Sequence, residues 1–242
     1  MAGLALGSVS QAGKKIALTF DDGPSEAWTA KYLEVLKEYQ APATFFLIGK
    51  HSQAHPELVR LIASTAVEVP WCAAAQPTVA SSSPAPDQGN AKVPGSQIKS
   101  QRVFMEIGAH SWSHQNLRKA SPSAIEAELN QTSQLLGRLM QRPVTLFRPP
   151  GGNYNQTLIA RANQKGQTVV LWNIDPKDWM PSHAQAGHLA RHVLAHARPG
   201  SIVLPHEGKP ATLAALPAII KGLRSRGYEL VTVSELLAAN SK

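Results

Sequence analysis

The feature that most constrains the fold of this 242-residue chain is a regular alternation of short β-rich runs with longer amphipathic segments. Parallel strands joined by helices produce such a pattern, because each parallel connection needs room for a crossover helix. Seven runs predict strands: 16–20, 44–48, 105–109, 145–148, 168–173, 201–204 and 229–233. We therefore expect an α/β fold in a single domain, a closed or nearly closed barrel whose reactive groups lie at the carboxyl ends of the strands.

Helical patterns lie between these runs, and the clearest spans residues 124–140. Its apolar residues recur at helical spacing: Ile125, Leu129, Leu135, Leu136 and Leu139. Ser121 can serve as the N-cap and Pro122 stands in the first turn, so both mark the start of a helix.

Composition limits the class of protein. With 43% hydrophobic residues the chain can bury a sizeable core, which excludes disorder throughout, collagen and a coiled coil. A net charge of +8 suits an acidic polymer, a wall or a membrane surface, whereas the lack of a basic run with interleaved aromatic residues argues against a nucleic-acid partner. Cys72 is the only cysteine, so neither an internal disulfide nor a cysteine-based zinc site is possible.

The sequence leaves the compartment open. No run of about 20 apolar residues predicts a transmembrane segment, and Met1–Gly13 lacks the charged start and long apolar middle of a secretory leader. We expect a monomer that is secreted or associated with the cell envelope if a leader is missing from this sequence, and cytoplasmic otherwise.

One segment breaks the alternation of strands and helices. Between Pro70 and Arg102, 18 of 33 residues are Ala, Ser, Pro or Gly, and no amphipathic period survives. A loop of this length inside a compact domain is uncommon and is either functional or disordered. Its composition favours disorder.

Two adjacent carboxylates end the first predicted strand. Asp21 and Asp22 lie in the run TFDDGP. Like charges this close resist joint ionisation unless a cation or a metal takes one of them. A turn made by Asp-Gly-Pro would explain the same residues without any function, so this cluster alone does not decide between the two.

Two histidines follow the third predicted strand, in the run HSWSH. His110 and His114 stand at positions i and i+4, within reach of a single ion on a helical turn. An isolated pair of this kind is more often surface decoration. Together with Asp22, however, the pair supplies two imidazoles and one carboxylate, an open ligand set that leaves room for water and substrate.

Three more polar clusters follow strand ends. The run RPPGG begins with Arg148, which emerges from a buried strand and needs a carboxylate partner, for which Asp21 is a good candidate. The run DPKDW contains Asp175 and Asp178, and His206 follows the sixth predicted strand. Each cluster lies where a barrel places its reactive groups.

These five runs, TFDDGP, HSWSH, RPPGG, DPKDW and LPH, resemble in order the five motifs of the polysaccharide deacetylases of carbohydrate esterase family 4, the NodB homology domain. The resemblance spans residues 14–237 apart from 70–102. It implies a distorted (β/α)7 barrel that removes acetyl groups from N-acetylated glycans such as chitin, chito-oligosaccharides or peptidoglycan. It implies that Asp22, His110 and His114 hold one divalent metal ion, with Zn²⁺ favoured over Co²⁺, Ni²⁺, Mn²⁺ or Fe²⁺.

The resemblance also implies roles in catalysis. Asp21, kept ionised by Arg148, would be the base that deprotonates a metal-bound water, and this water would attack the acetyl carbonyl. His206 would be the acid that protonates the leaving amine, and Asp178, in preference to Asp175, would orient it. The backbone N–H of Gly151 would stabilise the oxyanion.

The expected substrate-binding residues come from several motifs. They are Pro149, Gly151, Tyr154, Trp179 and Leu204; Trp112 fits a sugar site and a place in the core equally well. The family often carries an aromatic residue where Gly151 stands, so one wall of the acetyl pocket is expected to be more open here.

Three further histidines, His188, His192 and His196, repeat every four residues and could form a metal-binding stripe. Leu189 and Val193 run beside them as a core-facing row, so we favour a solvated histidine face and leave these three out of the site.

The DD and HxxxH motifs are further apart than is usual in the family. Removing residues 69–106 would join Glu68 to Ile107 and restore a continuous passage from helix to strand, so we expect these 38 residues to be an insertion. Every Val codon begins with GT and one Glu codon ends with AG, which raises the hypothesis of a retained intron. A genuine surface insertion is favoured, and sequencing of the transcript would decide between the two.

Two other functions fit the same residues. A relative with the same barrel and metal could act on small amides or imides, and an insertion before the metal-binding strand could leave a carbohydrate-binding protein with an impaired site. Asp21 and His206 weigh against the second, because binding alone does not require them.

Overall fold

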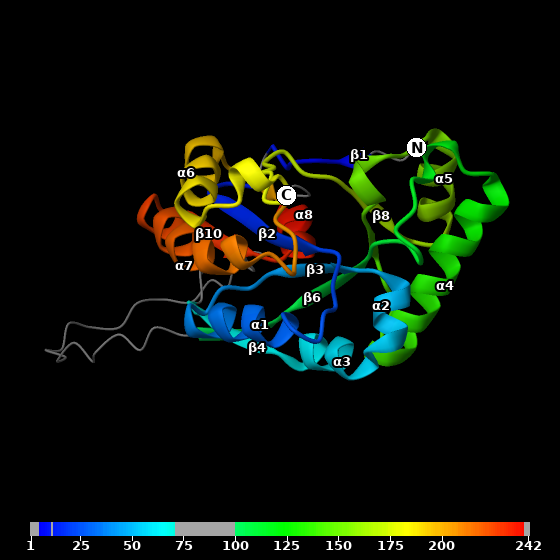
Figure 1. Ribbon diagram of the computed structural model, residues 1–242, viewed down its shortest axis with the longest axis horizontal. Helices are drawn as coiled ribbons and strands as arrows, with labels where there is room; N and C mark the ends of the chain where they lie inside the picture. Colours follow the sequence, from blue (N-terminus) through cyan, green and yellow to red (C-terminus); the bar gives the residue numbers. More distant parts are fainter. Residues whose placement is uncertain (1–4, 11, 71–99, 240–242) are drawn as a thin grey trace, which may run out of the picture.

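The computed structural model describes residues 5–10, 12–70 and 100–239. Its centre is a curled sheet of parallel strands with helices around the outside (Figure 1). The strands of this sheet are β1 (Ala5–Leu6), β2 (Lys15–Asp21), β3 (Thr44–Leu47), β6 (Glu106–Ala109), β7 (Leu146–Phe147), β8 (Thr168–Val170), β9 (Ile202–Val203) and β10 (Glu229–Val231). They follow the order β1-β8-β7-β6-β3-β2-β10, and β9 pairs with β2.

Strand β9 closes the sheet into a distorted barrel. It pairs in parallel with Ala17 and Leu18 of β2 on one side, and Val203 forms a bridge with Ile174 beyond the end of β8 on the other. Each of the seven runs predicted as strands coincides with a strand of this sheet, so the predicted barrel is confirmed. The two-residue strand β1, which pairs with β8, is too short to have been predicted.

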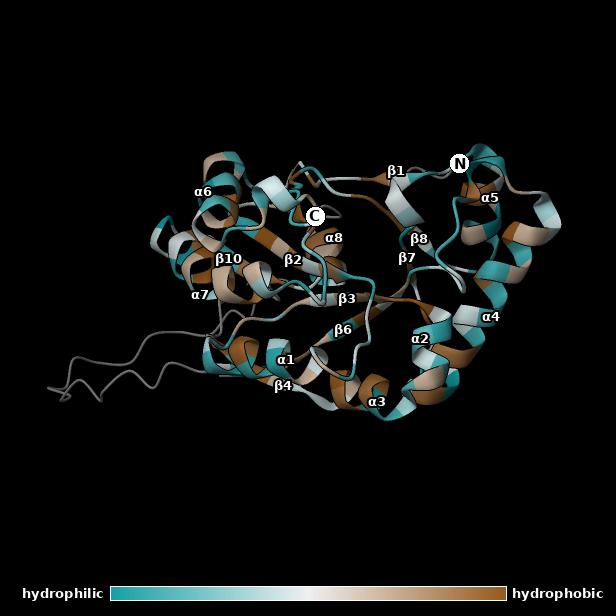
Figure 2. Ribbon diagram, in the orientation of Figure 1, coloured by the Kyte–Doolittle hydropathy of each residue, from teal (hydrophilic) through white to brown (hydrophobic). Residues whose placement is uncertain are grey.

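Helices cover the outside of the barrel. They are α1 (Thr29–Glu38), α2 (Gly49–Ala54), α3 (Pro56–Ser64), α4 (Pro122–Met140), α5 (Gln156–Gln164), α6 (Ala186–His196), α7 (Pro210–Ser225) and α8 (Val233–Ala238). Brown and teal stretches alternate along α1, α3 and α4 in Figure 2, as expected of helices with one face on a core. The predicted start of α4 is confirmed, because the Ser121 hydroxyl accepts a hydrogen bond from the N–H of Ala124 at 3.2 Å.

The expected insertion contains regular structure at both ends, which corrects the prediction of disorder for those ends. Strand β4 (Ala66–Pro70) pairs antiparallel with β5 (Ser100–Phe104). Val69 and Val103 are buried, and Glu106 belongs to β6, where its carboxylate accepts a hydrogen bond from the Thr44 hydroxyl at 2.7 Å. The ladder satisfies the backbone of residues whose composition is typical of a loop. The rest of the segment, residues 71–99, lies outside the described residues.

Helix α6 places its histidines as expected. Leu189 and Val193 are buried against the core, whereas His188 and His192 are half-buried and His196 is exposed.

No helix among the described residues is both long enough and apolar enough to span a membrane.

Candidate active site

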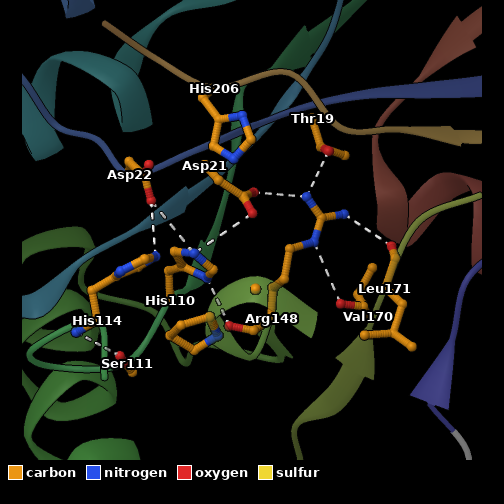
Figure 3. Close-up of polar contacts among 12 residues, drawn as sticks. Thr19, Asp21, Asp22, His110, Ser111, His114, Arg148, Val170, Leu171 and His206 are labelled. Carbon is orange, nitrogen blue, oxygen red and sulfur yellow. Dashed lines mark hydrogen bonds and ion pairs between the residues drawn. The ribbon is translucent and has the colours of Figure 1, made fainter. Parts of the chain in front are cut away.

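The polar clusters predicted from the sequence lie at the carboxyl ends of the barrel strands. Figure 3 shows Asp21, Asp22, His110, His114, Arg148 and His206 gathered there. Asp21 ends β2, His110 follows β6 and Arg148 follows β7. His206, beyond β9, forms a backbone bridge with Asp21, so the two residues lie side by side although 185 positions separate them in the sequence. The barrel therefore brings together residues from four strands.

Asp22, His110 and His114 form a compact group that could hold a metal ion. One ligand atom from each lies within 4.8 Å of the other two. The Nε2 atoms of His114 and His110 lie 3.2 and 3.6 Å from Oδ1 of Asp22 (Figure 3). This is the only group of three or more potential ligands among the described residues.

The buried His110 is held in the protonation state that suits a metal ligand. Its Nδ1 lies 2.8 Å from the backbone carbonyl of Arg148, and because a carbonyl can only accept, Nδ1 carries the proton. Burial lowers the pKa of His110 despite the nearby charges of Asp21 and Asp22. A neutral imidazole with its Nε2 lone pair turned toward Asp22 is the arrangement of a metal-binding histidine.

The two remaining members of this group influence one another. Burial is the largest influence on Asp22 and raises its pKa, but the close contact with the His114 imidazole and the charges of His110 and His206 bring the pKa down to about 2. The same contact raises the pKa of His114. Asp22 and His114 have φ angles of 77° and 57°, conformations that cost energy for residues other than glycine and that cluster at functional sites.

Asp21 is paired with a buried arginine, as the sequence suggested. Its Oδ1 lies 2.7 Å from Nη1 of the fully buried Arg148, and its Oδ2 faces Nε2 of His110 at 3.6 Å. Arg148 also donates to the Thr19 hydroxyl at 2.7 Å and to the Leu171 carbonyl at 3.0 Å. The arginine side chain is therefore held rigidly. It binds Oδ1 of Asp21 and does not bind Oδ2.

His206 is oriented by Asp178. Its Nδ1 lies 2.7 Å from Oδ1 of Asp178, whose Oδ2 accepts from the backbone N–H of His206 and from the Thr212 hydroxyl. Burial would lower the pKa of His206, but Asp178 and the charges of Asp21 and Asp22 outweigh it and raise the pKa. Asp175 instead accepts a hydrogen bond from the N–H of Lys177 and shapes the turn.

The expected substrate-binding residues differ in exposure. Trp179 and Tyr154 are among the few large apolar side chains that are exposed, at 53% and 36%, whereas Leu204 is buried at 3%. Pro149 is also buried, and the exposed Gly151 has a φ of 59°, which an L-residue rarely adopts. The two aromatic side chains therefore present part of their rings to solvent.

Sequence reasoning missed several residues that support the site. Thr19 bridges Arg148 and the carbonyl of Val203. Glu207, next to His206, accepts from the N–H of Ser25, and burial raises its pKa to about 7. Glu128 is a buried carboxylate on α4. Its charge on the apolar side of a helix was a signal in the sequence, but no sequence pattern indicates the contacts of Thr19.

Comparison with solved structures places the fold in a known class. The chain matches the structure of a carbohydrate esterase family 4 pseudoenzyme from Bacillus anthracis with a TM-score of 0.78, covering 98% of this chain and 70% of that chain, at 22% sequence identity. This likeness shows that the two chains share the fold of a distorted β/α barrel.

Sequence comparison identifies the family. The family model described as polysaccharide deacetylase matches residues 8–85 and 88–170, and this chain belongs to the polysaccharide deacetylase family. It is 32% identical over 229 residues to a peptidoglycan-N-acetylglucosamine deacetylase of Bacillus cereus, covering 93% of this chain and 88% of that protein. It is 31% identical over 231 residues to a chitooligosaccharide deacetylase of Rhizobium leguminosarum, covering 90% of this chain and 89% of that protein. The chain spans 38% of the longer PdaC, a peptidoglycan-N-acetylmuramic acid deacetylase of Bacillus subtilis.

Proposed function

We propose that this protein is a metal-dependent hydrolase that removes acetyl groups from N-acetylated glycans of the chitin, chito-oligosaccharide or peptidoglycan type. The observation that carries the proposal is the juxtaposition of three groups: the cluster of Asp22, His110 and His114, the pair of Asp21 with Arg148, and the pair of His206 with Asp178. The relatives named above act on such glycans, and the net charge of +8 suits an anionic wall.

The residues present fit a divalent metal. Oδ1 of Asp22 is buried and, among the described residues, has no hydrogen-bond partner of good geometry, although both histidine Nε2 atoms point toward it. Two imidazoles and one carboxylate favour Zn²⁺, with Co²⁺, Ni²⁺, Mn²⁺ and Fe²⁺ as alternatives. A bound ion would supply a Lewis acid that polarises the acetyl carbonyl and makes the attacking water more acidic.

The remaining residues would handle the protons. Asp21 would accept the proton of the attacking water, because Arg148 holds its Oδ1 in place while its Oδ2 faces His110. The backbone N–H of Gly151 would donate to the acyl oxygen as negative charge develops there. His206 would then donate its proton to the amine that leaves when the C–N bond breaks.

Metal removal tests the proposed cofactor. Chelation followed by dialysis should abolish acetate release from chitin oligomers and peptidoglycan fragments, and stoichiometric Zn²⁺ or Co²⁺ should restore it. In a His114→Ala variant the added metal should restore little, because one ligand is lost. Full activity in the chelated protein, verified as metal-free by elemental analysis, would contradict metal dependence.

The pH profile tests the acid. Activity is expected to fall as the pH rises through the pKa of His206, because the protonated form donates. Replacing Asp178 by Asn removes a carboxylate that raises this pKa, so the alkaline limb of kcat/KM should move to lower pH by about one unit or more. Asp175→Asn, a matched change at a carboxylate that does not contact His206, should leave the limb in place. An unchanged limb in Asp178→Asn would remove His206 from the role of acid.

A further inference from the structure

The loop between His110 and His114 has an unusual backbone. Ser111 and His114 both adopt left-handed conformations, with φ of 61° and 57°. Conformations of this kind persist in residues other than glycine only where the surroundings enforce them. The position of His114 opposite Asp22 therefore depends on what holds this loop.

One side of the loop is held by the start of α2. The backbone N–H groups of Gly49 and Lys50 donate to the carbonyls of Ser111 and Trp112, each at 2.9 Å. Within the loop, the Ser111 hydroxyl accepts from the N–H of His114 at 3.0 Å (Figure 3).

The other side is held by a single carboxylate, that of Glu128 on α4. Its Oε2 accepts from the backbone N–H groups of Trp112 and Ser113 at 2.7 and 2.9 Å. Its Oε1 accepts from the Ser113 hydroxyl at 2.6 Å and from the side-chain amide of Gln115 at 2.8 Å. All four donors come from residues 112–115, the segment that carries His114.

The environment of Glu128 shows that the loop is its main partner. The residue is 7% exposed, and no cation among the described residues forms an ion pair with it. Burial raises its pKa, but the hydrogen bonds from Ser113, Gln115 and Trp112 lower the pKa by more, so the group is ionised. Burying a carboxylate without a cation costs free energy unless its oxygens accept hydrogen bonds. Here donors of the loop bind both carboxylate oxygens of Glu128.

We propose that Glu128 is a positioning residue that fixes residues 111–115, holds His114 opposite Asp22 and thereby sets the affinity of the site for its metal. The inference rests on the proposed function, because it presupposes that Asp22, His110 and His114 bind the ion. Glu128 acts through the loop, in the way that hydrogen bonds behind metal ligands tune other metal sites.

Metal affinity of the Glu128→Gln variant tests this inference without reference to catalysis. The amide keeps the volume of the side chain but turns an NH₂ group toward donors, so hydrogen bonds to the loop are lost. The dissociation constant for Zn²⁺, measured by competition with a chromophoric chelator, should rise about 10- to 100-fold. Ser113→Ala, which removes only one of the four donors, should raise it less.

A matched control lies two residues away on the same helix. Glu126 pairs with Lys165 and Arg161 and forms no hydrogen bond or ion pair with residues 111–115, so Glu126→Gln should leave the Zn²⁺ dissociation constant unchanged. Thermal unfolding of each metal-free variant shows whether it is folded at the temperature of the titration. If Glu128→Gln is not folded, Ser113→Ala decides the test, because it removes a hydroxyl and leaves no new group to bury.

The outcomes separate this inference from the proposed function. A wild-type protein that binds no Zn²⁺ would overturn the metal site and the role of Glu128 together. Tight binding by the wild type with equal affinity in the folded Glu128→Gln and Ser113→Ala variants would overturn the role of Glu128 alone. Weakened binding in Glu128→Gln but not in Glu126→Gln would support it.

Discussion

Replacing Asp21 by Asn should lower kcat for acetate release from an N-acetylated glycan about a thousandfold while leaving the affinity for Zn²⁺ nearly unchanged. The amide occupies the same volume but cannot accept a proton from the attacking water. The three proposed metal ligands remain in place, so the metal should still bind. Steady-state acetate release and a Zn²⁺ titration on the same preparation measure the two quantities.

The Asp21→Asn variant also disturbs the surrounding protein, so a control must separate loss of stability from loss of catalysis. Asp21 is the partner of the fully buried Arg148, and an uncompensated buried charge lowers the free energy of unfolding by about 3–5 kcal/mol. Rates should therefore be compared at a temperature at which thermal unfolding shows both proteins to be folded. Asp175→Asn, at another strand end, should retain normal turnover. Near-normal turnover in Asp21→Asn would remove Asp21 from the role of base.

The His206→Ala variant should lose activity in a way that depends on the leaving group. An amine is a poor leaving group unless it is protonated, so acetate release from N-acetylglucosamine oligomers should fall about a thousandfold. The leaving group of an activated aryl ester is a stable phenolate, which needs no proton in order to leave. Hydrolysis of such an ester by the variant should therefore fall by much less than hydrolysis of the amide. Both rates can be measured on one preparation with matched metal content.

The ratio of the two rates distinguishes an acid from a structural residue. His206 lies beside Asp21 and its backbone N–H binds Asp178, so its removal could in principle disturb the whole site. A disturbed site would slow the hydrolysis of the ester and of the amide by the same factor. Equal losses on both substrates would therefore contradict the role of His206 as the acid.

Most of the barrel could be predicted because local patterns determine it. Each predicted strand is a short apolar run, and α4 begins at the capping residue Ser121 that the sequence marks. Strand β1 could not be predicted, since two residues carry no period and Ala5 and Leu6 become a strand only by pairing with β8. The pairing of β4 with β5 was missed for a similar reason, because partners far apart in the sequence stabilise it rather than the composition of either strand.

The positions of the site residues could be predicted, but not the contacts that hold them. Parallel strands end at one side of a barrel, so Asp21, His110, Arg148 and His206 had to converge there. Thr19 could not be recognised, because its contact with Arg148 spans 129 positions and depends on the curvature of the sheet. The pairing of Glu128 with the histidine loop depends likewise on how α4 packs beside β6.

The fold alone does not establish the proposed activity. A structural neighbour with a TM-score of 0.78 is described as a pseudoenzyme, so the same barrel occurs without activity. What favours an active enzyme in this chain is the presence of two pairs, Asp21 with Arg148 and His206 with Asp178, which supply the proposed base and the proposed acid. Carbohydrate binding requires neither pair.

Acetate release tests the central claim most directly. The Zn²⁺-loaded protein should be incubated with N-acetylglucosamine oligomers, peptidoglycan fragments and small amides, and free acetate and free amine should be quantified together. We expect acetate and amino groups to appear in equal amounts from at least one of the glycans and none to appear from the small amides. Release from small amides alone, or no release from any acetylated glycan by a protein shown to hold its metal, would contradict the assignment.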